Sequence, residues 1–274
     1  MTQLKTNNDI TISNNRLSVQ VSLTGLSFLI TDQESKELLF FAEEEFSTSR
    51  TPEELLIELE KAFSKYSSLQ EKFDEIRVVY ATNIYSLVPN ALFDETKASD
   101  YLKFNSKLLE SDYIAHDTIE NYEMVVVYVP FININNYIFD RFGSFQYFHA
   151  SSLLLKYVLD TEKNCQDDKV YIHAFRTTFD LVIMKSGTLQ LCNTYTYNTP
   201  EDFIYYILFG FEQLGLNPEI TETVLCGAIS ENDETYKVAY QFIRNISLKK
   251  PVAPSGDIGL EDSAISTFIL LNSL

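Results

Sequence analysis

Two stretches of the chain, RTPEELLIELEKAF at 50–63 and NTPEDFIYYILFGF at 198–211, share one pattern for starting a helix. In each, a threonine (Thr51 or Thr199) is placed to cap the helix with its hydroxyl. The proline that follows suits the first helical position, and the acidic residues after it suit the positive end of the helix dipole. Glu54, three residues after its threonine, completes a capping box. The pattern predicts two helices that begin in the same way.

Strand-like segments surround both helix starts in the same order. Apolar and polar residues alternate before each helix, which is typical of half-buried strands. These segments cover 17–21, 26–30 and 38–41 in the first half and 170–174, 179–183 and 189–191 in the second. After the helices, EIRVVYA at 75–81 matches ETVLCGA at 222–228. The chain is therefore predicted to be α/β, with two copies of a strand-strand-strand-helix-strand unit, each a mixed sheet with helices.

Composition changes suggest how the two copies are divided along the chain. Residues 1–15 are polar and are expected to form a flexible tail. The polar stretch TEKNCQDDK at 161–169 is the best linker. We therefore expect a first domain at 16–162 and a second at 163–274.

Three further segments give additional expectations. Residues 97–110 are predicted to form an exposed helix. MVVVYVP at 124–130 is a continuous apolar run, which is typical of a strand buried on both faces. The apolar segment at 260–274 is expected to form a final helix or strand.

Charge and cysteine content exclude several classes of protein. The net charge is −18 and no Lys/Arg cluster occurs, so nucleic-acid binding is not expected. No apolar run approaches the roughly 20 residues of a membrane span, and the N-terminus has no apolar leader. Cys165, Cys192 and Cys226 are widely spaced, which argues against disulfides or a zinc site. We expect a cytoplasmic protein with free thiols.

The hairpin LSVQVSLTGLSFLI at 17–30 and the run VVVYVPFININNYIFDRFGSFQYFHASSLLL at 125–155 resemble the DUF3822 family of Bacteroidetes proteins. The duplicated unit resembles the actin-like ATPase superfamily (ASKHA, RNase H-like), which includes actin, heat-shock chaperone ATPases, sugar kinases and PilM. The resemblance implies that fold. It implies no activity, since the DUF3822 family has none established.

The superfamily motifs that hold nucleotides are incomplete in this chain. The first hairpin usually carries an Asp before its turn, but no acid lies between Leu17 and Thr31. The second hairpin, HAFRTTF at 173–179, has neither the Asp nor the Gly of the usual pattern. The adenosine motif keeps one glycine and replaces its partner with Ala228. The resemblance leaves six weak candidates for ligand binding: Thr24, Gly25, Arg176, Thr177, Thr178 and Gly227.

Phosphoryl transfer depends on positioning and on metal-borne charge, so the loss of both hairpin acids argues against it. We interpret the chain as a non-catalytic actin-like protein that serves as a binding or scaffolding module, with no catalytic residue, metal or cofactor. The alternative is a divergent ATP-binding protein or kinase that uses ATP and magnesium. It would need Asp180 or Asp32, and both are expected to be poorly placed.

The histidines give no strong catalytic signal. Asp112, His116, Asp117 and Glu120 are expected on a loop, which is too irregular for a metal site. His149 is interpreted as a helix cap or core residue. His173 is interpreted as a core residue.

A protein partner is expected, and self-association is left open. The candidate surfaces are the aromatic runs Tyr195–Tyr197 and Tyr137–Phe142, although core packing of the tyrosines is an equal explanation. The second repeated helix is apolar nearly all round at 203–211. It is expected to be buried on more than one side, by packing between domains or in a protein-binding surface.

Overall fold

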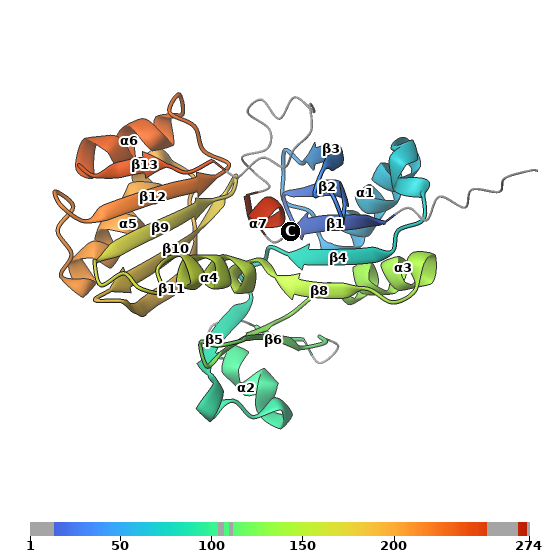
Figure 1. Ribbon diagram of the computed structural model, residues 1–274, viewed down its shortest axis with the longest axis horizontal. Coiled ribbons are helices and arrows are strands. Elements are labelled where there is room, and N and C mark those ends of the chain that lie inside the picture. Colours follow the sequence, from blue (N-terminus) through green and yellow to red (C-terminus); the bar gives the residue numbers. More distant parts are fainter. Residues whose placement is uncertain (1–13, 104–106, 110–111, 251–267, 273–274) are drawn as a thin grey trace, which may run out of the picture.

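The computed structural model describes residues 14–103, 107–109, 112–250 and 268–272. Within these ranges the chain forms two five-stranded sheets and one three-stranded sheet (Figure 1). The predicted tail at 1–15 lies outside the described residues except for its last two positions, and the first strand begins at Asn15.

The first five-stranded sheet, called the first sheet below, has the strand order β3-β2-β1-β4-β8. Its strands are β1 (Asn15–Ser22), β2 (Gly25–Asp32), β3 (Leu38–Glu45), β4 (Glu75–Tyr80) and β8 (Gln146–His149). The helices α1 (Pro52–Lys65) and α3 (Ile132–Phe142) contact each other. Phe63 of α1 packs edge-on against Phe28 of β2, with ring centroids 5.8 Å apart. The alternating apolar residues of β1 and β2 therefore form the core beneath α1.

The second five-stranded sheet, called the second sheet, repeats this arrangement with the order β11-β10-β9-β12-β13. Its strands are β9 (Lys169–Ala174), β10 (Thr178–Lys185), β11 (Thr188–Thr196), β12 (Glu222–Gly227) and β13 (Ile246–Leu248). In both sheets the first three strands of the copy are antiparallel, and the fourth pairs in parallel with the first. The helices of this copy are α5 (Pro200–Leu214) and α6 (Glu234–Phe242). The predicted duplication is confirmed.

Both predicted helix starts are confirmed in detail. Thr51 Oγ1 accepts from the backbone N–H of Glu54 at 3.3 Å, and the carboxylate of Glu54 accepts from the N–H of Thr51 at 2.9 Å. Thr199 and Asp202 form the same reciprocal pair, with both bonds at 3.1 Å. The two copies thus fix their first long helix by the same local chemistry.

A small sheet of order β5-β7-β6 is inserted in the first copy, at the lower part of Figure 1. It consists of β5 (Tyr85–Pro89), β6 (Ala115–Ile119) and β7 (Met124–Tyr128), joined to α2 (Ala98–Leu102). Short 3₁₀ turns occupy Ser67–Gln70, Asn90–Leu92 and Glu95–Lys97. The central β7 is buried from Val125 to Tyr128, as its apolar run predicts. The helix predicted at 97–110 is shorter than expected, because α2 ends at Leu102; positions 104–106 and 110 lie outside the described residues.

The helices α4 (Ala150–Thr161) and α7 (Phe268–Asn272) bring the two large sheets together. Figure 1 shows α7, in red, between the sheets, and it contacts both α4 and β12. Phe268 packs edge-on against Tyr157 of α4 at 5.3 Å between ring centroids. One apolar core consequently includes residues of both sheets, from Val19 to Val224. Of the final segment predicted at 260–274, only α7 falls within the described residues.

Helix α5 is less buried than its composition predicts. Phe203, Ile207 and Phe211 are fully buried against the second sheet. On another face Tyr205 is 61% exposed and Phe209 is 44% exposed. Helix α5 contacts both α6 and β11, so it is buried on more than one side. These contacts lie within its own copy, so packing between domains does not explain the apolar surface that is left open to solvent.

Candidate functional site

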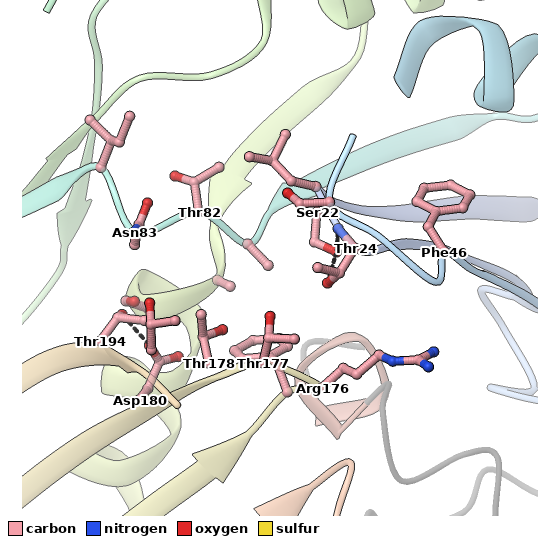
Figure 2. A pocket seen from close by; sticks show the side chains of 18 of the residues that line it. Ser22, Thr24, Phe46, Thr82, Asn83, Arg176, Thr177, Thr178, Asp180 and Thr194 are labelled. Atoms are coloured by element: carbon pink, nitrogen blue, oxygen red, sulfur yellow. Dashed lines mark hydrogen bonds between the residues drawn. The ribbon is translucent and has the colours of Figure 1, made fainter. Parts of the chain in front are cut away.

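A cavity of about 410 Å³ lies where the turns of the two hairpins, β1–β2 and β9–β10, face each other (Figure 2). We call it the cleft cavity. Its walls come from these turns, from the segment after β4 at 81–84, and from the start of α4 at 149–151. The parallel strands β1, β4, β9 and β12 end toward this region, which is where open α/β sheets place their ligands.

The lining of the cleft cavity is dominated by hydroxyl groups. Eleven of the described lining residues are serine or threonine, and they include the predicted candidates Thr24, Thr177 and Thr178. Hydroxyls both donate and accept hydrogen bonds, so the cavity suits a polar ligand. The structure brings these three candidates together from two segments that lie far apart in the sequence.

Arg176, the fourth candidate, also lines the cavity but its charge is used elsewhere. Its Nη1 lies 2.6 Å from Oε2 of Glu45, and its side chain is half exposed. Figure 2 shows its guanidinium directed away from Asp180. The guanidinium therefore belongs to the mouth of the cavity.

Asp180 lies on the wall of the cleft cavity, which differs from the sequence-based expectation. The alternation along β10 does place it opposite the apolar Phe179 and Leu181. That opposite face of β10, however, lines the cleft cavity at Asp180. Asp180 is only 2% exposed, and one carboxylate oxygen accepts a hydrogen bond from Thr194 Oγ1. Asp32, by contrast, lies at the far end of β2 and binds the turn at Ser35, as expected.

Next to Asp180, the polar atoms of His173 are buried without hydrogen-bond partners among the described residues. His173 is fully buried on β9, and its Nδ1 lies 3.7 Å from Asp180 Oδ2. This separation is too long for a hydrogen bond. His173 is a core residue, as interpreted, but its polar edge is turned to the base of the site.

His149 caps helix α4 beside the same cavity. Its Nδ1 accepts from the backbone N–H of Ser151 at 3.1 Å, and its ring packs on Tyr85 with centroids 4.7 Å apart. Burial lowers the pKa of His149 to about 4, so the ring is neutral at pH 7. The interpretation of His149 as a cap and core residue is confirmed.

Asp117 holds the same helix start from the other side. Asp117 and His116 lie on β6, and Asp112 and Glu120 lie outside it, so the expected loop is correct for only half of the cluster. The carboxylate of Asp117 accepts from the N–H of His149 at 2.7 Å and from Ser152 Oγ at 2.6 Å. Burial raises the pKa of Asp117. No group of three metal-ligating side chains is found in the described part of the chain.

The two candidate glycines serve the backbone. Gly227 has a φ of +87°, and a Cβ there would lie 2.2 Å from the carbonyl oxygen of Ala174. Gly25 lines a small adjoining pocket, where a Cβ would lie 3.0 Å from the carbonyl oxygen of Glu44. Close strand packing therefore explains Gly227 without a ligand.

Sequence reasoning did not single out Glu43, which lines the pocket beside Gly25. Desolvation by burial raises the pKa of Glu43 to about 7, although Ser27 Oγ lies 3.2 Å from it and lowers that pKa in part. The available signal in the sequence was the run of three acids at 43–45. The alternation of side chains along a strand directs Glu43 of this run toward the pocket.

The aromatic runs proposed as partner surfaces are largely internal. Tyr195 stacks on Tyr206 at 4.9 Å, and the hydroxyl of Tyr197 donates to the carbonyl oxygen of Phe175. Phe142 packs against Phe63. The core explanation holds for these rings, but Phe139 of the second run is 59% exposed. Helices α5 and α6 also expose aromatic side chains, among them Tyr205 and Tyr240.

The family model described as "Protein of unknown function (DUF3822)" matches residues 4–246. The chain belongs to the DUF3822 family. A search of curated protein sequences gave no match. Among solved structures, the DUF3822 protein is similar to a Bacteroides thetaiotaomicron protein of unknown function with an actin-like ATPase fold. The identity is 21%, the match covers 94% of this chain and 96% of that one, and the TM-score is 0.79.

A second similar structure is a chain of the PilM–PilN type IV pilus biogenesis complex. Its identity is 10%, the match covers 94% of this chain and 96% of that one, and the TM-score is 0.60. These likenesses show that the DUF3822 protein has the actin-like ATPase fold, as the sequence resemblance implied. Within the described ranges, no helix is long and apolar enough to cross a membrane.

Proposed function

We propose that this DUF3822 protein is a non-catalytic actin-like protein that acts as a binding or scaffolding module in the cytoplasm. The observation that best supports this proposal is the arrangement of charged side chains in the cleft cavity. Asp180 is the only carboxylate among the described lining residues, and Arg176, the only fully charged cation there, is paired outward with Glu45. An ATPase of this fold needs acids to hold a metal and donors to hold phosphates. The three free cysteines suit a reducing compartment.

The direct test is isothermal titration of the full chain with ATP, with and without magnesium. We expect no measurable heat from a protein shown to be folded by circular dichroism. Magnesium-dependent binding tighter than about 100 μM, which is about −5.5 kcal/mol, would overturn the proposal.

A divergent ATP-binding protein is the second candidate, and the position of Asp180 favours it. A carboxylate at the wall of the cleft could orient a metal-bound water. No second acid lines the described part of the cavity, and His173 occupies the position opposite Asp180 on β9. The same titration, followed by a phosphate-release assay, separates the two candidates.

For the binding role, a protein is the proposed class of partner. The structurally similar PilM–PilN chain belongs to a complex, and α5 exposes two aromatic rings, Tyr205 and Phe209, that stack at 6.3 Å. Exposed aromatic side chains are enriched where proteins bind one another. A second copy of the chain could also cover this surface. Sedimentation of the wild-type protein distinguishes self-association from binding of another protein.

A further inference from the structure

We infer that the cleft cavity is a site for an organic cation, an ammonium or guanidinium group that pairs with Asp180. The inference deepens the proposed function and rests on its premise that the protein binds a ligand or partner without transforming it.

The first step is the unsatisfied carboxylate. Asp180 is 2% exposed, and while Oδ1 accepts from Thr194, Oδ2 has no hydrogen-bond partner among the described residues. A buried charged oxygen without a donor is costly. Oδ2 faces His173 Nδ1 at 3.7 Å, and Asp180 also lines the cavity, so a ligand that enters can supply a donor to this carboxylate.

The second step is that the described lining provides no positive charge for this carboxylate. Arg176 pairs with Glu45 at the mouth. His173, the nearest imidazole, is 3.7 Å away through Nδ1 and makes no hydrogen bond to Asp180. Among the described residues no cationic side chain forms a hydrogen bond with Asp180, so we expect the ligand to carry the positive charge.

The third step concerns the rest of the lining. An ammonium group has three donors. The hydroxyl of Thr178 offers a further acceptor beside Asp180, and that of Thr82 lies on the opposite wall of the cavity (Figure 2). The rings of Phe131 and Phe175 also line the cavity, and aromatic faces attract organic cations. The ring of Phe46 lines it too, but already faces the guanidinium of Arg50 at 5.2 Å. Sites for divalent ions combine carboxylates with other oxygen ligands, and Asp180 is the only carboxylate among the described lining residues. No group of three metal-ligating side chains occurs in the described part of the chain.

The fourth step separates this ligand from a polyphosphate. The first turn of α4, which could attract an anion, is already capped by His149 and bound by Asp117. The whole chain carries a net charge of −18. Both features raise the electrostatic cost of bringing in phosphates and lower it for cations.

The cation has two possible sources, a free amine or a lysine or arginine side chain of a protein partner. We would titrate the isotope-labelled full chain with butylammonium chloride and with the peptide acetyl-Gly-Ser-Lys-Ser-Gly-amide, at about 0.15 M salt to suppress weak surface attraction. Amide resonances of Thr177 and Thr178 report occupancy. Potassium chloride and the norleucine version of the peptide are the controls.

The matched variants are Asp180→Asn and Asp140→Asn. Asp140 is an exposed residue of α3, so the two variants have the same net charge. We expect saturable shifts in the wild type and in Asp140→Asn, and an affinity weaker by about tenfold or more in Asp180→Asn. If Asp180→Asn does not fold, Thr178→Val serves as the second variant and should also weaken binding.

Binding of the amine without the peptide identifies a free small molecule as the source, and binding of the lysine peptide but not its norleucine version identifies a partner side chain. Equal shifts in Asp180→Asn, equal shifts with potassium chloride, or no saturable shift with either probe would each overturn the inference. Magnesium-ATP binding at the same resonances would overturn the proposed function as well. Failure of the amines alone leaves the non-catalytic proposal standing.

Discussion

Arg176 Nη1 lies 2.6 Å from Glu45 Oε2 and joins residues 131 positions apart at the mouth of the cleft cavity. Both side chains are at least half exposed, so water and salt screen the pair. We predict that Arg176→Ala lowers the free energy of unfolding by less than about 1 kcal/mol. Urea denaturation measures this change, and a loss several times larger would mean that the pair holds the two large sheets together.

Gly227→Ala should be strongly destabilising. The added methyl group would lie 2.2 Å from the carbonyl oxygen of Ala174, and the φ of +87° is strained for alanine. Gly215→Ala is the control, because Gly215 also has a positive φ, +64°, but its Cβ would contact only Lys185 Nζ at 3.9 Å. We expect a cost of about 1–2 kcal/mol for Gly215→Ala and clearly more for Gly227→Ala in thermal unfolding. Equal costs would contradict the packing explanation of Gly227.

We predict that the buried carboxyl group of Glu43 lowers the free energy of unfolding as the pH rises. Its pKa is raised from 4.5 to about 7 because burial disfavours the charged carboxylate. Between these values the folded protein keeps a proton that the unfolded chain has lost, so the contribution of Glu43 to stability falls from pH 4.5 to pH 7. Glu43→Gln should therefore be more stable than the wild type at pH 8, on the order of 1 kcal/mol after solvent screening. The advantage should shrink toward pH 4.5, and a difference independent of pH would refute this assignment.

We predict that the titration of His149 lowers the free energy of unfolding as the pH falls. Burial lowers its pKa from 6.5 to about 4, so between these values the unfolded chain binds a proton that the folded protein does not. Its contribution to stability is therefore present above pH 6.5 and is lost as the pH falls toward 4, by up to about 3 kcal/mol. His149→Asn keeps a side-chain cap for α4 without this titration. The free energy of unfolding should be measured against pH for Glu43→Gln and for the double variant Glu43→Gln with His149→Asn. Between pH 6.5 and 4 it should fall more steeply in the protein that keeps His149, and parallel curves would exclude His149 as the cause.

The exposed face of α5 should tolerate substitution. Tyr205→Ser with Phe209→Ser removes rings that are 61% and 44% exposed, and we expect a change in unfolding free energy of about 1 kcal/mol or less. Phe203→Ala, on the buried face, should cost about 3–5 kcal/mol. Denaturant unfolding compares them. A double variant as unstable as Phe203→Ala would show that the two rings support the fold, which would remove the basis for a binding surface there.

Local signals predicted the repeated part of the fold well. The capping boxes at Thr51 and Thr199 depend on residues within one turn, and strand alternation depends on neighbours two positions apart. Both could therefore be recognised without knowledge of the tertiary structure. The two large sheets have corresponding strand orders, as expected for two copies of one sequence pattern.

The candidate site was predicted less completely, because it depends on which elements pack against each face of a strand or helix. Alternation placed Asp180 opposite Phe179, but only the arrangement of the two large sheets shows that this face lines the cleft cavity. The exposure of Tyr205 depends in the same way on the absence of a covering element among the described residues. The small sheet was missed in part because its edge strands β5 and β6 carry polar residues such as His116.

Helix α7 has a consequence for how the protein is made. It completes a core whose first strand begins at Asn15, and its Phe268 covers Tyr157. On the ribosome, the strands of both large sheets are synthesised before these apolar residues emerge. Nascent chains that stop short of α7 would carry an uncovered apolar surface, which makes them prone to aggregation and suitable for binding by chaperones.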